Sequence, residues 1–111
     1  MVAALRGEVW TVAGGAGRLS SKPRPALIVT SDDFGDLDWV TTVLITTDDT
    51  QSPTRVPLGA AEAGLDRPSF AMADKLHTVP RKNLGARCGK VSTATMLDVE
   101  RAILVYLDIA R

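Results

Sequence analysis

The sequence predicts an α+β fold that is mainly β, in which a small, strongly bent antiparallel sheet or partial barrel is closed by one C-terminal helix. Two observations carry this prediction. Short segments rich in β-branched and aromatic residues, separated by glycine, proline and aspartate, fill most of the chain. Near the C-terminus, apolar residues instead recur at three- and four-residue steps. At 111 residues, the chain is expected to form one domain, residues 1–111, around a single core.

The strands expected before the helix are short and follow one another closely. Two of them are nearly unbroken in apolar and β-branched character, which is typical of strands buried on both faces, and the aspartate-rich piece between these two is predicted to be a turn. Pro57 restricts the segment that contains it to a sheet edge or a bulge. The six segments are residues 6–12 (RGEVWTV), 24–31 (RPALIVTS), 39–47 (WVTTVLITT), 54–59 (TRVPLG), 69–79 (SFAMADKLHTV) and 86–92 (ARCGKVS).

The C-terminal helix is expected to begin at Ser92 or Thr93, whose hydroxyl can cap the first turn, and to continue to about Ile109. Its apolar residues define one face, as required of a helix packed on a domain core. The residues of this face are Met96, Val99, Ile103 and Leu107, and Leu97 and Leu104 widen it.

Composition excludes several classes of protein. With 45% hydrophobic and 23% charged residues the chain is typical of a soluble globular protein. The apolar run 102–107 is too short to cross a bilayer, and the start MVAALRGEVW lacks a signal-peptide pattern, so a cytoplasmic location without membrane contact is expected. Cys88 and His77 are the single cysteine and histidine, and the stretch DDFGDLD lacks the terminal glutamate of an EF-hand loop, so no metal or cofactor is predicted.

Charge is balanced overall but unevenly distributed. Thirteen basic residues match thirteen acidic ones. An aspartate-rich span, 32–49, contains no base, whereas the span 75–90 contains five Lys or Arg residues and no acid. Solvated loops of opposite sign are one interpretation, and a local phosphate-facing patch on a neutral protein is the other.

Arg24 and the pair Thr46 and Thr47 are the strongest candidates for chemistry. Arg24 opens one buried strand and Thr46 closes the next, so both side chains project from the same rim if these strands are neighbours. A guanidinium beside a hydroxyl donor suits a phosphate. Alternatively, Arg24 pairs with Asp32 or Asp33, and the threonines reflect β propensity alone; the pattern leaves both interpretations open.

The segments RGEVWTV, KPRPALIVTSDDF, VLITT, DRPSFAMADKLHTV and GKVS, followed by the terminal amphipathic helix, resemble in this order the MazF/PemK (Kid) family of toxins from bacterial type II toxin–antitoxin systems. The similarity extends from Arg6 to Ile109. It implies an SH3-like barrel of the CcdB/PemK kind, a homodimer, a cognate antitoxin, and an mRNA interferase, which is a sequence-specific endoribonuclease for single-stranded RNA. The acidic residue that family members often carry before the RP motif is absent from GRLSSKP, so the general base is not assigned.

The resemblance also implies roles for individual residues. The arginine of the family's RP motif falls on Arg24 and the threonine of its IT[ST] motif on Thr46, so both are expected to be catalytic. We expect a metal-independent attack of a ribose 2′-oxygen, with Arg24 neutralising charge on the phosphoryl group and Thr46 donating to it. The further residues expected to bind RNA are Thr47, Lys22, Lys75, His77, Arg81 and Lys82.

Two other functions remain open on the same fold. One is a gyrase-poisoning toxin of the CcdB type, which acts through a C-terminal aromatic residue. The ending YLDIAR has no tryptophan, which disfavours this alternative. The other is a catalytically inactive relative that only binds its partners.

Overall fold

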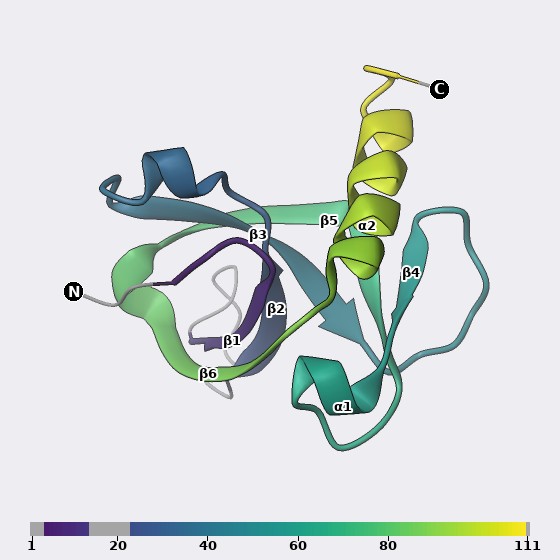
Figure 1. Cartoon of the computed structure of the whole chain (residues 1–111), viewed down its shortest axis with the longest axis horizontal. Helices are drawn as coiled ribbons and strands as arrows, with labels where there is room; N and C mark the ends of the chain where they lie inside the picture. The colour runs from purple at the N-terminus through teal and green to yellow at the C-terminus, as the bar shows by residue number, and fades with distance from the viewer. Residues whose placement is uncertain (1–3, 14–22, 111) are drawn as a thin grey trace.

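The computed structural model describes residues 4–13 and 23–110. Its centre is one six-stranded antiparallel sheet with the spatial order β4-β5-β3-β2-β1-β6 (Figure 1). The predicted α+β, mainly β architecture is therefore confirmed, and among the described residues the bent sheet stays open between its edge strands β4 and β6. The strands are β1 (Glu8–Val12), β2 (Arg24–Ile28), β3 (Trp39–Thr46), β4 (Arg55–Leu58), β5 (Ser69–Pro80) and β6 (Leu84–Lys90).

The helical elements are α1 (Ala60–Ala63), α2 (Thr93–Tyr106) and two 3-10 turns, η2 (Asp32–Phe34) and η3 (Arg81–Asn83). The sequence predicted α2 but not α1, which has only four residues and is too short to show a helical period. Ser92 caps α2 as expected, because its Oγ accepts a hydrogen bond from the backbone N–H of Thr95 at 3.1 Å. Neither α1 nor α2 is long and apolar enough to span a membrane.

The sheet is buried on both faces, which explains the unbroken apolar character of β2 and β3. One core lies between the sheet and α2 and includes Val9, Leu27, Val43 and Val99. The second lies on the opposite face, inside the bend of the sheet, and includes Trp10, Ala26, Ile28 and Val40. Because neighbouring residues of a strand point to opposite faces, each apolar pair in β2 contributes to both cores.

The apolar face of α2 is narrower than the sequence predicted. Met96 and Val99 are buried, and Ile103 packs against the first core. Leu97, Leu104 and Leu107 are 47%, 37% and 45% exposed, so the expectation that these three pack on the core is wrong. For Leu104 and Leu107 the physical reason is that the C-terminal half of α2 rises beyond the edge of the sheet (Figure 1).

The arrangement of β2, β3 and β5 decides where the site lies. β3 lies between β2 and β5 and is antiparallel to both. Antiparallel neighbours start where the central strand stops, so the first residues of β2 and β5 lie beside the last residues of β3. Three segments that are distant in sequence therefore meet at one end of the sheet.

Candidate active site

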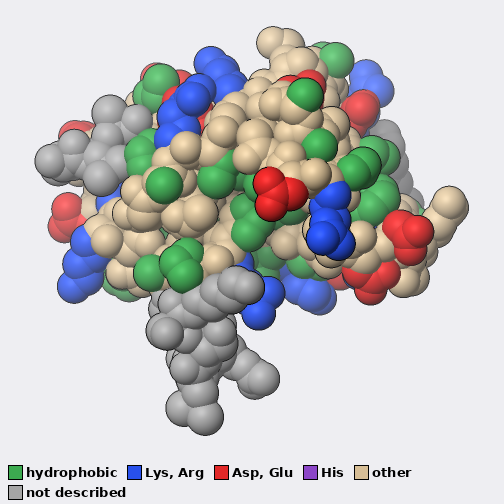
Figure 2. Space-filling model, turned by 90° about the horizontal axis from the view of Figure 1, so that it is seen from below, with side chains coloured by type: hydrophobic (Ala, Val, Ile, Leu, Met, Phe, Trp, Pro, Cys, Tyr) green, Lys and Arg blue, Asp and Glu red, His purple; other side chains and the backbone are tan. Residues whose placement is uncertain are grey.

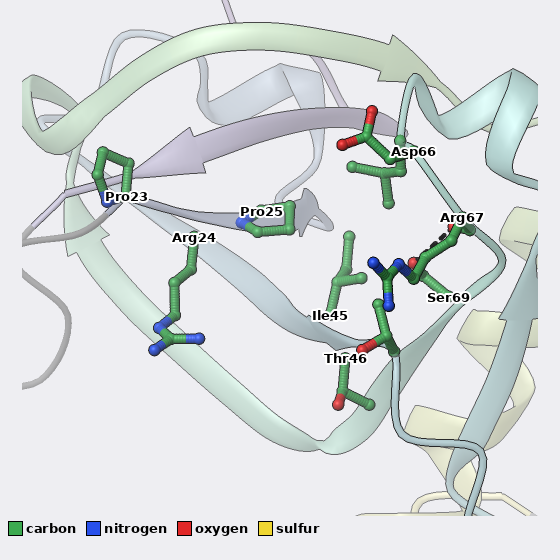
Figure 3. A pocket seen from close by; sticks show the side chains of 10 residues that line it. Pro23, Arg24, Pro25, Ile45, Thr46, Asp66, Arg67 and Ser69 are labelled. Atoms are coloured by element: carbon green, nitrogen blue, oxygen red, sulfur yellow. Dashed lines mark hydrogen bonds between the residues drawn. The ribbon is translucent and has the colours of Figure 1, made fainter.

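A pocket of about 440 Å³ occupies this end of the sheet (Figure 3). Its walls come from the start of β2, the end of β3 and the connection that leads into β5. The residues that line it are Pro23, Arg24, Pro25, Ile45, Thr46, Thr47, Leu65, Asp66, Arg67 and Ser69. Arg24, Thr46 and Thr47, which the sequence singled out together, thus do lie together in space.

Pro25 restricts the backbone at Arg24. A residue that precedes proline is biased toward extended backbone, so Pro25 holds Arg24 in the strand conformation from which β2 begins. Ala26 pairs with Leu44 in the antiparallel ladder. Arg24 lies two residues before Ala26, and Thr46 lies two residues after Leu44, so the two are neighbours at this end of the sheet. Side chains alternate along a strand, so both project to the same face of the sheet, as Figure 3 shows.

The guanidinium of Arg24 is exposed and has no hydrogen bond or ion pair among the described residues. The alternative that Arg24 pairs with Asp32 or Asp33 is therefore wrong. Both carboxylates follow the opposite end of β2, and Oδ1 of Asp32 accepts a hydrogen bond from the backbone N–H of Arg6 at 2.7 Å. No acceptor in the described part of the chain occupies the donors of Arg24, so they are available to a ligand.

Thr46 is oriented by the loop that follows it. The backbone N–H of Asp48 donates to Thr46 Oγ1 at 3.1 Å. This contact uses the oxygen as an acceptor and leaves the hydroxyl hydrogen available to donate. Thr46 can therefore offer one hydrogen bond to a phosphoryl oxygen on the face that Arg24 shares.

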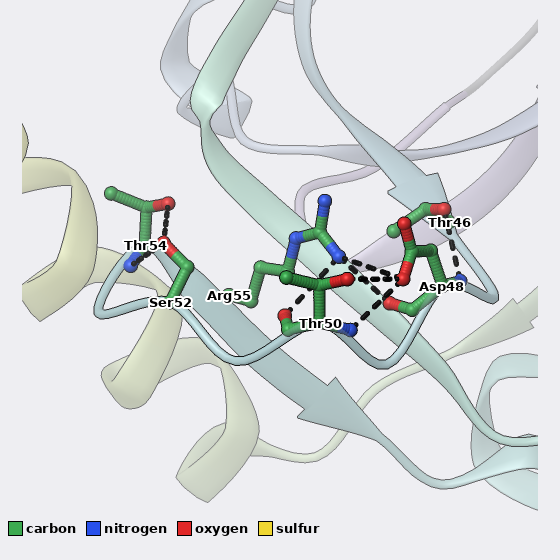
Figure 4. A network of polar contacts seen from close by, with 6 residues as sticks. All are labelled: Thr46, Asp48, Thr50, Ser52, Thr54 and Arg55. Carbon is green, nitrogen blue, oxygen red and sulfur yellow. Dashed lines mark hydrogen bonds and ion pairs between the residues drawn. The ribbon is translucent and has the colours of Figure 1, made fainter.

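The loop after β3 is held by Arg55 and Asp48 (Figure 4). Arg55 Nη1 donates to the carbonyl oxygens of Asp48 and Thr50 at 2.9 and 3.2 Å. Oδ1 of Asp48 accepts from the N–H and the hydroxyl of Thr50 at 2.9 and 2.7 Å. These hydrogen bonds from Thr50, together with the nearby Arg55, hold the pKa of Asp48 below its ordinary value. The network fixes the loop whose N–H orients Thr46.

The third wall of the pocket was not predicted from the sequence. Gly64 ends α1 at φ +69°, and a Cβ there would lie 1.8 Å from the carbonyl oxygen of Cys88, so only glycine permits this turn into the pocket loop. Farther along, the hydroxyl of buried Ser69 donates to the carbonyl oxygen of Arg67 at 3.0 Å. The loop therefore presents Asp66 and Arg67 from a fixed backbone.

Comparison with known proteins identifies the family. Residues 5–107 match the family model described as the PemK-like, MazF-like toxin of type II toxin–antitoxin systems. The chain belongs to this toxin family. Over 107 residues it is 41% identical to a probable endoribonuclease MazF of Mycolicibacterium smegmatis, and the match covers 95% of this chain and 97% of that protein.

Two solved structures resemble the toxin over nearly its whole length. An endoribonuclease in complex with its cognate antitoxin, from a mycobacterial species, has a TM-score of 0.83 and 27% identity, covering 98% of this chain and 99% of that one. The Mycobacterium tuberculosis toxin MazF-mt6 has a TM-score of 0.80 and 28% identity, covering 94% and 99%. The fold that the resemblance implied is thus confirmed, and the matches favour the endoribonuclease expectation over the gyrase-poisoning alternative.

The other residues expected to bind RNA are placed differently in the toxin. Thr47 lines the pocket. Lys75 and His77 lie on β5 outside the lining, and His77 pairs with Thr42. Lys82 is exposed in η3, and Lys22 lies outside the described residues. Of the described residues in this group, only Thr47 lies beside Arg24 and Thr46.

Arg81 was expected to contact RNA, but its side chain is only 7% exposed. Nε donates to the carbonyl oxygen of Leu37 at 2.6 Å and Nη2 to that of Phe34 at 3.3 Å, and the backbone N–H donates to Asp38 O at 2.8 Å. Arg81 therefore fastens the turn between β2 and β3, and the expectation that it contacts RNA is wrong.

The span 75–90 contains no acidic residue, but carboxylates from outside the span lie beside two of its cations. Nε of Arg87 donates to Oε2 of Glu8 at 2.7 Å, and Lys75 Nζ lies 3.7 Å from an Asp74 oxygen. On the face shown in Figure 2, Lys and Arg side chains are dispersed among Asp and Glu side chains. Among the described residues, three of the five cations of this span are engaged within the fold: Arg87 by Glu8, Lys75 by the adjacent Asp74, and Arg81 by backbone carbonyl oxygens. The span therefore does not present five unpaired cations to a phosphate.

Glu8 is the buried carboxylate of this arrangement. Burial alone raises its pKa, but hydrogen bonds from the Leu5 N–H, Arg87 and Trp10 Nε1 outweigh that effect and lower the pKa below its ordinary value.

Burial raises the pKa of the Cys88 thiol, which makes it a poor nucleophile. In the described part of the chain, no three His, Cys, Asp or Glu side chains are grouped to hold a metal ion.

Proposed function

We propose that this toxin is a sequence-specific endoribonuclease that cleaves single-stranded RNA, such as mRNA, at the pocket containing Arg24 and Thr46. The observation that carries this proposal is that a guanidinium with no partner among the described residues and an oriented hydroxyl share one face of an open pocket. A guanidinium is the side chain best suited to two oxygens of one phosphate, and the hydroxyl adds a neutral donor. Membership of the toxin family and the 41% identical MazF relative support the choice of RNA as the substrate.

The reaction that suits this site uses the nucleophile of the substrate itself. The 2′-oxygen of the ribose on the 5′ side of the cut bonds to phosphorus, and the bond from phosphorus to the 5′-oxygen breaks. The 2′-hydroxyl loses its proton and the departing oxygen gains one. Arg24 neutralises the charge that develops on the phosphoryl oxygens, and Thr46 donates to one of them, so both act mainly by electrostatic stabilisation and positioning.

Analysis of the reaction products tests the proposal. Cleavage should leave a 2′,3′-cyclic phosphate on one fragment and a free 5′-hydroxyl on the other. Replacing the single ribose on the 5′ side of the cut by deoxyribose should stop cleavage while binding stays nearly unchanged, since most contacts are to phosphates and bases. The unmodified RNA should be cut equally well in excess EDTA. Efficient cutting of the substituted strand, a 5′-phosphate on the product, or a magnesium requirement would contradict the mechanism.

The same proposal includes partners of the toxin. We expect the toxin to be cytoplasmic and to form a homodimer. The dimer is favoured because the end of α2 exposes apolar side chains that a second copy can cover; these are Leu104, Val105, Tyr106, Leu107 and Ile109. A cognate antitoxin, small and acidic, would neutralise the toxin, as one similar mycobacterial endoribonuclease is seen in complex with its own antitoxin. The proposed contacts for RNA beyond the cut remain Thr47, Lys75, His77 and Lys82, together with Lys22, which lies outside the described residues.

A further inference from the structure

The dipeptide Arg-Pro occurs twice in this chain, and each copy precedes or opens a strand. Arg24-Pro25 opens β2, and Arg67-Pro68 immediately precedes β5. Because β2 and β5 flank β3 and are both antiparallel to it, both dipeptides reach the end of the sheet where β3 stops. Topology therefore places a second arginine at the same pocket as the first.

Arg67 is exposed, and its guanidinium has no hydrogen bond or ion pair among the described residues. Its backbone is nevertheless fixed, because the hydroxyl of Ser69, which is only 2% exposed, donates to its carbonyl oxygen. Pro68 adds restriction by biasing Arg67 toward extended backbone. A guanidinium that has no partner among the described residues, and whose backbone is fixed, is suited to binding an anion rather than to stabilising the fold.

Arg67 enters the pocket on a different side from Arg24. In Figure 3 the Arg67 side chain extends from the connection before β5 toward Ile45, whereas Arg24 and Thr46 project together in another direction. Ile45 and Thr46 are adjacent in β3, so their side chains point to opposite faces. One phosphate held by Arg24 and Thr46 is therefore not the group that Arg67 is placed to meet.

We propose that Arg67 binds the backbone phosphate of RNA next to the scissile one, so that the strand crosses the end of β3 between two arginines. This inference rests on the proposed function, and it assigns Arg67 to substrate binding rather than to the chemical step. Loss of Arg67 should therefore raise KM and weaken binding, with little change in kcat. Arg24, by contrast, belongs to the scissile phosphate.

Binding to an RNA that carries deoxyribose at the cut site measures this contact without cleavage. Arg67→Ala should weaken binding about tenfold at low salt. It should also reduce the slope of log Kd against log salt by about 0.7, the value for one phosphate contact on a single strand. Arg67→Lys, which keeps the charge, should retain that slope. Arg101→Ala, which removes an exposed cation of α2, is the matched control and should leave both quantities unchanged.

Uncharged replacements for single phosphates show which phosphate Arg67 contacts. A methylphosphonate placed on the 5′ or on the 3′ neighbour of the scissile phosphate should weaken wild-type binding at one of the two positions. At that position, Arg67→Ala should bind the modified and unmodified RNA equally. If both proteins lose the same affinity at each position, or if Arg67→Ala lowers kcat as strongly as Arg24→Ala, the assignment is wrong. A wild-type protein that binds RNA without cutting it would refute the proposed function, whereas these binding comparisons would still decide the role of Arg67.

Discussion

Replacing Arg24 by alanine should separate catalysis from folding. The side chain is exposed, has no partner among the described residues, and leaves Pro23 and Pro25 in place to define the start of β2. Surface substitutions of this kind usually change the free energy of unfolding by less than about 0.5 kcal/mol. For a domain of this size, that corresponds to a shift in Tm of less than about 4 °C.

The effect on cleavage should be far larger. Removing one neutral donor from an oxyanion site typically lowers kcat by about 10²- to 10³-fold. A charged donor is about twice as strong, and Arg24 is the only cation that shares a face with Thr46 within the described pocket. Arg24→Ala should therefore lower kcat by at least about 10³-fold, or about 4 kcal/mol at 1.4 kcal/mol per factor of ten. The kcat of Arg24→Lys should lie between those of wild type and Arg24→Ala, since lysine keeps the charge but loses the planar guanidinium.

The assay is single-turnover cleavage of a fluorescently labelled RNA, with thermal unfolding of the same preparations. An Arg24→Ala protein that unfolds at the wild-type temperature and no longer cuts supports the assignment. If the variant cleaves at the wild-type rate, Arg24 is not the group that meets the phosphate. If it has lost its folded structure, the arginine has a structural role that its lack of contacts does not explain.

Two further predictions follow from the site and the core. Thr46→Ala should lower kcat by about 10²-fold, whereas Thr46→Ser should retain most activity because it keeps the hydroxyl; equal losses in single-turnover cleavage would exclude a role for the hydroxyl. The lowered pKa of Glu8 means that its ionised form stabilises the fold above about pH 4.3, the unfolded value, and that this stability is lost as the pH falls through the folded-state pKa. Between about pH 6 and pH 3, denaturant unfolding should therefore show a larger loss of stability for wild type than for Glu8→Gln; identical pH profiles would contradict that account.

The strands were predictable because their physical signals are local. Buried β2 and β3 have nearly continuous apolar and β-branched sequences, and the prolines and glycines at their ends mark the turns. The pairing of Arg24 with Thr46 at one rim was also predictable, since a strand that ends and a neighbour that begins must meet in an antiparallel sheet. Both inferences needed only the order of strands and the alternation of side chains.

Contacts between distant segments could not be predicted in the same way. Arg81 follows a strand and resembles an exposed turn residue in sequence, but its guanidinium is enclosed by carbonyl oxygens of the turn before β3. Arg87 is neutralised by Glu8, which is far away in the chain. The exposure of Leu107 depends on where the sheet ends beneath α2. Each outcome is set by tertiary packing, which the sequence next to Arg81, Arg87 or Leu107 does not reveal.

The contrast between the arginines suggests how the chain separates stability from function. Arg81, Arg55 and Arg87 each have acceptors within the fold, and each holds a turn, a loop or a buried carboxylate. Arg24 and Arg67 have none among the described residues, although their backbones are fixed by prolines and, at Arg67, by the hydroxyl of Ser69. An unpaired guanidinium contributes little to folding, and a fixed backbone limits the entropy lost when it binds a phosphate. The arginine that precedes a proline at the start of a strand is therefore the local signal that would have identified Arg67 together with Arg24.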